Sequence, residues 1–254
     1  MKRTSKILFM AMALTIATTG AAMATPSTQI WIPSTDVQAF KSVHLGLDNY
    51  LRTSSGGADT RPNVYDLGVT AGVLPFEKVQ AEVGVDYLVN GISGYDSNPL
   101  YFNAKLATPE GALFEASPAL AVGGYNIGTN SDKGSAFRTD MNIVYGLVAK
   151  TLPVVGRLSA GYYVGNDKVL LDKNGNKEND GVLLSWDRTM SEISDKLWLA
   201  ADYQGGDNSM GAFSLGASWA FSKNVSVIFG YDIYNDKAMA GQNTFTTQVD
   251  INFP

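Results

Sequence analysis

Ionisable residues recur at alternate positions along the chain, a spacing that places them on one face of extended segments. In Val79–Asn90 (VQAEVGVDYLVN) every odd position is apolar, whereas Glu82 and Asp86 lie on the even positions. A period of two is typical of a β-strand, because successive side chains point to opposite faces. The set of such polar-face residues is Asp48, Asp66, Glu82, Asp86, Asp187, Asp202, Asp232, Asp250, Lys105, Lys150, Arg157 and His44.

If these side chains line one lumen, acids outnumber bases and the lumen attracts cations. The order of residues within each segment predicts two levels. The acids Asp48, Asp66, Asp86, Asp202 and Asp232 lie towards the ends that carry long loops. The bases Lys105, Lys150 and Arg157 lie towards the opposite ends, where Glu82, Asp187 and Asp250 could pair with them.

Two other groups of residues suggest different chemistry. His44 and Asp48 share a face, but four residues of strand separate them by about 13 Å, too far for a catalytic His–carboxylate pair. The segment Asp172–Asp180 has an oxygen ligand at every second position, as calcium loops do, yet Gly175 is at the fourth position instead of the sixth. We expect a solvated loop there and no enzymatic activity.

Composition excludes several classes of function. The chain has no cysteine and one histidine, so thiolate sites are absent and a zinc site is not expected. Its formal net charge of −5 disfavours nucleic acid as a partner. No cofactor is indicated.

The first 24 residues have the organisation of a secretory signal peptide. Lys2, Arg3 and Lys6 precede the apolar run Ile7–Ala17, and Ala22–Ala24 is a small-x-small cleavage site. Removal takes three of the 19 basic residues and none of the 24 acidic ones, so the net charge becomes −8. Residues 25–40 have no clear period, and we expect a periplasmic lead-in before a domain that spans residues 41–254.

Alternation from Lys41 onwards predicts twelve strands. Connections after even-numbered strands are short, and those after odd-numbered strands are longer and polar. Aromatic residues of the apolar face gather at two heights, as in transmembrane barrels. In the segment 118–128 both faces are small or apolar, and Tyr125 and Ile127 are expected to face outwards. In the segment 141–151 the alternation predicts Ile143, Tyr145, Leu147 and Ala149 outside and Asn142, Gly146 and Lys150 inside.

The predicted fold is therefore all-β: an antiparallel up-and-down transmembrane β-barrel of about 12 strands. A soluble β-sandwich would also alternate, but its outer faces should carry Lys, Glu and Thr. No charged residue lies on the assigned apolar face of any strand.

The signal peptide, the alternating strands and the near-terminal Phe253 resemble Gram-negative outer-membrane β-barrel proteins of porin-like type. This resemblance implies location in the outer membrane, contact with its lipids and lipopolysaccharide, and insertion by periplasmic chaperones and the barrel-assembly machinery. Pro254 after the terminal aromatic residue departs from the usual pattern.

The function expected is a passive channel for small hydrophilic solutes with a preference for cations. Many polar-face positions are Gly, Ser, Ala or Thr, among them Gly72, Gly216 and Gly230, which would leave the lumen unfilled. The alternative is a closed-lumen structural or ligand-binding barrel, blocked by Arg157, Tyr163, Trp198 and the segment 25–40. A barrel hydrolase that depends on His44 is a third, weaker hypothesis.

Overall fold

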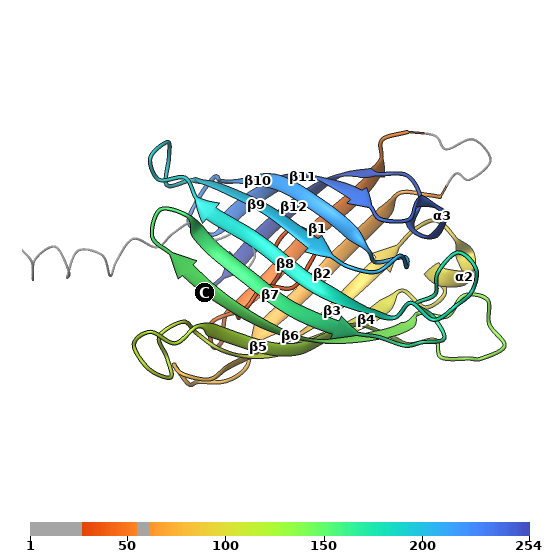
Figure 1. Cartoon of the computed structure of the whole chain (residues 1–254), viewed down its shortest axis with the longest axis horizontal. Helices are drawn as coiled ribbons and strands as arrows, with labels where there is room; N and C mark the ends of the chain where they lie inside the picture. The colour runs from red at the N-terminus through yellow and green to blue at the C-terminus, as the bar shows by residue number, and fades with distance from the viewer. Residues whose placement is uncertain (1–26, 55–60) are drawn as a thin grey trace, which may run out of the picture.

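The computed structural model describes residues 27–54 and 61–254, so the signal peptide predicted at residues 1–24 lies outside the described residues. Within that part, twelve antiparallel strands close a barrel in which each strand pairs with its sequence neighbours and β1 pairs with β12 (Figure 1). The strands are β1 (Val43–Arg52), β2 (Val64–Gly72), β3 (Gln80–Val89), β4 (Leu100–Thr108), β5 (Ala119–Gly128), β6 (Asp140–Leu152), β7 (Gly156–Val164), β8 (Asp180–Thr189), β9 (Leu197–Gln204), β10 (Ala212–Ala220), β11 (Val225–Tyr234) and β12 (Thr244–Phe253).

The predicted up-and-down barrel is confirmed. The C-terminus lies at the end that carries the connections β2–β3, β4–β5, β6–β7, β8–β9 and β10–β11, on the left of Figure 1. The opposite end carries the remaining loops, including the short helices α2 (Ser93–Asp96) and α3 (Lys237–Ala240). By the topology rule for such barrels, we name these ends periplasmic and external. In the described parts of the chain, no helix has the length and apolar character needed to cross a membrane.

The outer wall is apolar and exposed, which suits contact with lipid. Side chains between 37% and 58% exposed on this wall include Leu47, Leu67, Val69, Val83, Leu106, Val122, Val144, Leu158, Leu184, Leu215 and Phe229. Near the external loops the exposed residues include five aromatic side chains: Tyr65, Tyr87, Phe102, Phe213 and Phe245. Phe221 and Phe253 lie at the periplasmic end. An apolar band between two aromatic girdles is the surface of a transmembrane barrel.

The faces predicted for β6 are reversed, and one of the two positions predicted for β5 is wrong. In β6, Ile143, Tyr145, Leu147 and Ala149 are buried inside, whereas Val144 and Val148 are exposed. Alternation cannot choose a face when both faces are apolar.

In β5 the face changes within the strand. The register of β5 against β6 shifts between Tyr125 and Ile127, where Asn126 has a left-handed φ of 52°. A bulge of this kind moves the residue after it to the other face. Ile127 is exposed as predicted, but Tyr125 points inwards and its hydroxyl donates to Gln204 Oε1 at 3.1 Å.

The segment before β1 lies inside the barrel and not in the periplasm. Ile30 and Ile32 are 2% and 0% exposed, and Ile30 packs with Trp198 and Ile228 of the barrel wall. The segment 27–42 then leaves along the wall at Gly72, which Phe40 meets in a parallel bridge. The expected lead-in is therefore an insert, and it occupies part of the lumen.

Candidate functional site: a divided lumen

The β9–β12 wall holds the insert by hydrogen bonds to its backbone. Asp202 Oδ2 accepts from the backbone N–H of Ile30 at 2.8 Å and of Trp31 at 2.9 Å. Gln248 Nε2 donates to the carbonyl of Ile30 at 2.8 Å. Asp202 therefore binds the insert and is turned away from any solute path.

A second attachment joins the insert to β7 and β8. Arg157 donates from Nε to Asp187 Oδ1 at 2.9 Å and from Nη1 to Asp36 Oδ2. Gln29 Nε2 also donates to Asp187 Oδ1, at 3.0 Å, and Trp198 Nε1 donates to Asp187 Oδ2 at 3.2 Å. Arg157 is thus shared between a wall carboxylate and an insert carboxylate.

The third attachment uses β3 and β4. Lys105 Nζ lies 3.0 Å from Glu82 Oε1, and it also donates to the carbonyls of Ser27 at 2.8 Å and Asp36 at 2.6 Å. The backbone N–H of Gln38 donates to Glu82 Oε2 at 2.8 Å. Lys105 and Glu82 are both almost fully buried, and they interact with each other and with the insert.

Wall glycines make room for the insert. A Cβ on Gly72 would lie 2.0 Å from the carbonyl oxygen of Ala39, and one on Gly230 would lie 3.0 Å from the Ile30 side chain. A Cβ on Gly216 would also come within 3.1 Å of Ile30. The lumen volume that these small residues leave, which we expected to be solvent, is filled by chain here.

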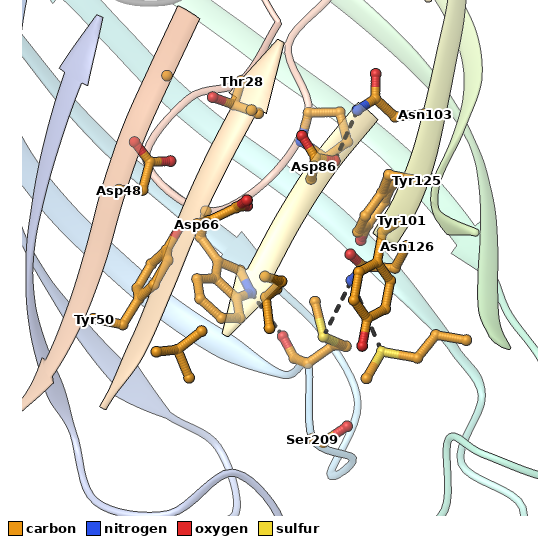
Figure 2. A pocket seen from close by; sticks show the side chains of 18 of the residues that line it. Thr28, Asp48, Tyr50, Asp66, Asp86, Tyr101, Asn103, Tyr125, Asn126 and Ser209 are labelled. Carbon is orange, nitrogen blue, oxygen red and sulfur yellow. Dashed lines mark hydrogen bonds between the residues drawn. The ribbon is translucent and has the colours of Figure 1, made fainter. Parts of the chain in front are cut away.

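The other side of the lumen is open. A cavity of about 720 Å³ lies between the insert and the wall formed by β1 to β6 (Figure 2). Along β1 its lining runs from Arg52, near the external loops, to His44 in the periplasmic half. Among the described residues, the strands β7 to β10 contribute nothing to this lining.

Of the five described acidic residues that line the cavity, three lie close together on β1, β2 and β3. Asp48 and Asp66 are directly opposite each other on β1 and β2, and Asp86 on β3 is opposite Gly68. Asn103 Nδ2 donates to Asp86 Oδ2 at 2.8 Å. Figure 2 shows the three acids along one wall, with Tyr50, Tyr101 and Asn103 around them.

Three arginines lie among the lining residues, but each is engaged by other groups. Arg52 donates to the carbonyls of Gln242 and Pro62 and lies over the Tyr234 ring. Arg61 donates to carbonyls of α3, and Arg138 forms a paired contact with Asp140 at 2.9 and 2.6 Å. Among the described residues, no basic side chain makes an ion pair with Asp48, Asp66 or Asp86 within 4.0 Å.

The groups around His44 are not arranged as in a hydrolytic triad. Its Nδ1 is 3.1 Å from Asn252 Oδ1 and its Nε2 is 3.7 Å from Asp250 Oδ1. Ser226 Oγ donates to Asp250 Oδ2 at 3.2 Å, so the carboxylate lies between the serine and the imidazole. In a hydrolytic triad the imidazole must lie between the other two groups.

The remaining predicted residues divide between inside and outside. Asp232 is buried inside, where it accepts from Ser214 at 2.8 Å and Thr244 at 2.7 Å. Lys150 is not in the lumen: it lies on the outer face of β6 at the periplasmic end, with Nζ 2.8 Å from Glu110 Oε1. Lys150 faces outwards because the two faces of β6 are the reverse of those predicted.

In the loop Asp172–Asp180, side-chain oxygens accept hydrogen bonds from the loop itself. Asp172 Oδ1 accepts from the backbone N–H groups of Asn174 and Asn176, both at 2.8 Å. The hydrogen bond from the Asn176 side chain is the main reason that the pKa of Asp172 is lowered. Across the described residues, no three His, Cys, Asp or Glu side chains group as metal ligands would.

Several residues of the site were missed from the sequence. Asp36, Gln29 and Gln38 lie in a segment without periodicity, so no pattern assigned them to the lumen. Asn103 alternates with the outward residues of β4, which predicts that it faces inwards, and the position of Tyr101 opposite Asp86 could have been inferred from the hairpin register.

Comparisons with known proteins concern solved structures alone, because no family model and no curated protein matches the chain. A structure titled KdgM porin is 7% identical, with 83% of this chain and 99% of that chain covered and a TM-score of 0.49. The NanC porin is 10% identical, with 83% and 99% covered and a TM-score of 0.47. Omp33 of Acinetobacter baumannii is 9% identical, with 84% and 98% covered and a TM-score of 0.43. Similarity at this level assigns no function.

Proposed function

We propose that the protein is a passive outer-membrane channel for small hydrophilic solutes, with the cavity beside the insert as its conduit. The observation that carries this proposal is the division of the lumen. One side is packed by residues 27–42, and the other side holds about 720 Å³ of space lined along most of the length of β1. A cavity of this volume suits solutes of low molecular mass.

The outer surface supports the membrane location. The exposed apolar band and the aromatic residues at its two edges match the surface that lipid requires. The signal-peptide pattern in residues 1–24 supports export to the outer membrane, where lipopolysaccharide, periplasmic chaperones and the barrel-assembly machinery are the partners we propose.

The charge of the conduit supports a preference for cations. Asp48, Asp66 and Asp86 face the cavity without ion-pair partners among the described residues, whereas Glu82 and Asp187 are neutralised by Lys105 and Arg157. Carboxylates in a confined, low-dielectric passage raise the local concentration of cations and exclude anions.

A closed-lumen barrel is the second candidate, and one observation favours it. Gln38 Nε2 donates to Asn252 Oδ1 at 3.3 Å, and His44 lies against the same oxygen. These three side chains, from the insert, β12 and β1, meet at the periplasmic end of the cavity. If they seal it, the cavity is a binding pocket that opens to the outside.

The test is single-channel recording of the purified full chain in planar bilayers with a KCl gradient. The proposal predicts discrete conductance steps and a reversal potential of the sign given by potassium permeation. In D48N/D66N/D86N the reversal potential should move towards zero, while the matched external variant D207N keeps the wild-type value. Absence of conductance would favour the closed barrel, and anion preference would contradict the charge argument.

A further inference from the structure

The external half of the cavity combines acidic and aromatic groups in a way that ion permeation alone does not require. Asp48 and Asp66 each keep one buried carboxylate oxygen, Oδ1, for which no hydrogen-bond partner is found within the described structure. Asp86 has the Asn103 amide as its hydrogen-bonding neighbour. Three carboxyl groups thus gather here without a basic side chain paired to them in the described structure.

Two buried tyrosines point to an occupant independently of the acids. Tyr101 is 5% exposed, lines the cavity and lies directly opposite Asp86 in the β3–β4 register. No hydrogen bond to its hydroxyl is found among the described residues, and the same holds for the hydroxyl of Tyr145, which is 7% exposed and also lines the cavity. Because both residues line the cavity, both hydroxyls are available to a molecule inside it.

A group of three aromatic rings from the insert, β1 and β11 also lines the cavity. Trp31 packs edge-on against Tyr50 at 5.4 Å and against Tyr234 at 5.6 Å between ring centroids, and all three rings line the cavity. The Arg52 guanidinium lies 5.3 Å from the Tyr234 ring centroid, so this aromatic group already accepts one cation. Aromatic faces attract ammonium groups most strongly where water is excluded.

The size and lining of the space favour an organic cation over a bare metal ion. A volume of about 720 Å³ is in the range of small-molecule pockets, which are mostly apolar with a few placed polar groups. A metal ion would need several converging ligands, and no group of three such side chains occurs in the described residues. Asp66 and Asp86 are instead offset along adjacent strands, which suits a cation that carries an alkyl body.

We propose that this cavity binds a small organic cation whose ammonium group lies between the carboxylates of Asp66 and Asp86 and the rings of Trp31, Tyr50 and Tyr101. The proposal names the solute class of the conduit and in that respect rests on the proposed function, although binding itself requires no conduction.

The test is isothermal titration calorimetry of the purified full chain in detergent, with choline as the probe. Its uncharged isostere 3,3-dimethylbutan-1-ol has the same shape, so we expect saturable binding of choline and none of the alcohol. D86N and Y101L should each weaken choline binding by about tenfold or more, the effect of losing one charged or cation–π contact. The matched control D207N removes a carboxylate from the exposed external surface and should keep wild-type affinity.

Equal affinity for both probes, or unchanged choline affinity in D86N and Y101L, would overturn the proposal. Each variant is first checked for the folded barrel by its heat-modifiable electrophoretic mobility, and D66N replaces D86N if the latter does not fold. Conductance measured in parallel separates the two proposals. Choline binding by a barrel without conductance refutes the channel alone, whereas conductance without choline binding refutes this site alone.

Discussion

At the scale of single residues, glycine and arginine in the wall decide whether the insert fits. Gly72 is the point of closest approach, because any Cβ there would lie 2.0 Å from the Ala39 carbonyl oxygen. That oxygen belongs to the backbone and cannot move aside as the tip of a side chain can. The insert and the barrel wall are therefore matched to each other in shape.

Replacing Gly72 by alanine should lower the free energy of unfolding by about 1–3 kcal/mol, the usual cost of overpacking. G146A is the matched control, because a Cβ on Gly146 meets nothing within 4 Å. The measurement is urea unfolding in lipid vesicles followed by tryptophan fluorescence. Equal stability of the two variants would contradict the close approach at Gly72.

Arg157 makes the second residue-scale prediction. In R157Q the carboxylates of Asp36 and Asp187 lose their shared cation inside the barrel, and breaking such a pair typically costs about 3–5 kcal/mol. R188Q is the control, since Arg188 pairs with Glu192 on the exposed periplasmic rim and such pairs contribute about 0–1 kcal/mol. The same unfolding assay compares them; a small loss in both would show that Arg157 does not anchor the insert.

At the scale of elements, the connection between β4 and β5 is tied to β6 by Glu110. Lys150 Nζ is 2.8 Å from Glu110 Oε1, and the backbone N–H of Thr151 donates to Oε2 at 3.0 Å. Partial burial alone would raise the pKa of Glu110, but the hydrogen bonds from Lys150 and Thr151 outweigh it and lower this pKa. The periplasmic turn is thus attached through an ionised carboxylate.

This attachment predicts a pH dependence with a definite sign. Because the folded-state pKa is lowered, the stabilisation is complete above the ordinary glutamate pKa of about 4.3 and is lost as the pH falls through the folded value. Wild type should therefore lose more stability than E110Q between neutral pH and the acidic range, in urea unfolding midpoints measured at each pH. Parallel pH profiles for the two proteins would count against the contact.

The sequence predicted those elements in which alternation is unambiguous. In β3 the apolar and polar positions separate along nearly the whole strand, and its predicted limits, Val79–Asn90, differ from the observed ones by one residue at each end. In β6 both faces are apolar, so periodicity could not distinguish lipid from a packed lumen. Tyr125 was misplaced because a single inserted residue, Asn126, reverses the face within β5.

No pattern in residues 25–40 favours the lumen over the periplasm, so only the closed-lumen alternative predicted that this segment lies inside the barrel. Residues 27–42 are held by long-range contacts to side chains far along the chain, such as Asp202 to the Ile30 amide, and a segment without period gives no sign of them. Small lumen residues are equally ambiguous, since Gly216 or Gly230 is compatible with water or with a second chain segment beside it. The alternating pattern predicted the barrel, but it did not distinguish a lumen filled by water from one filled by residues 27–42.

At the scale of the whole molecule, the lumen is divided: the cavity lies beside β1 to β6, and packed chain lies beside β7 to β10. The chain has no cysteine, so a single introduced cysteine is the one thiol that a reagent can modify. Asn103 lines the cavity, whereas Ser218 points into the packed side and is 3% exposed.

The most direct measurement is modification of N103C and S218C by a thiol-reactive trimethylammonium reagent, added to the full chain in lipid bilayers and followed by mass and by current. The division of the lumen predicts that the reagent modifies N103C and reduces its current, while S218C remains unmodified. Equal modification of both cysteines would contradict it, because the lumen would then be open across its whole width.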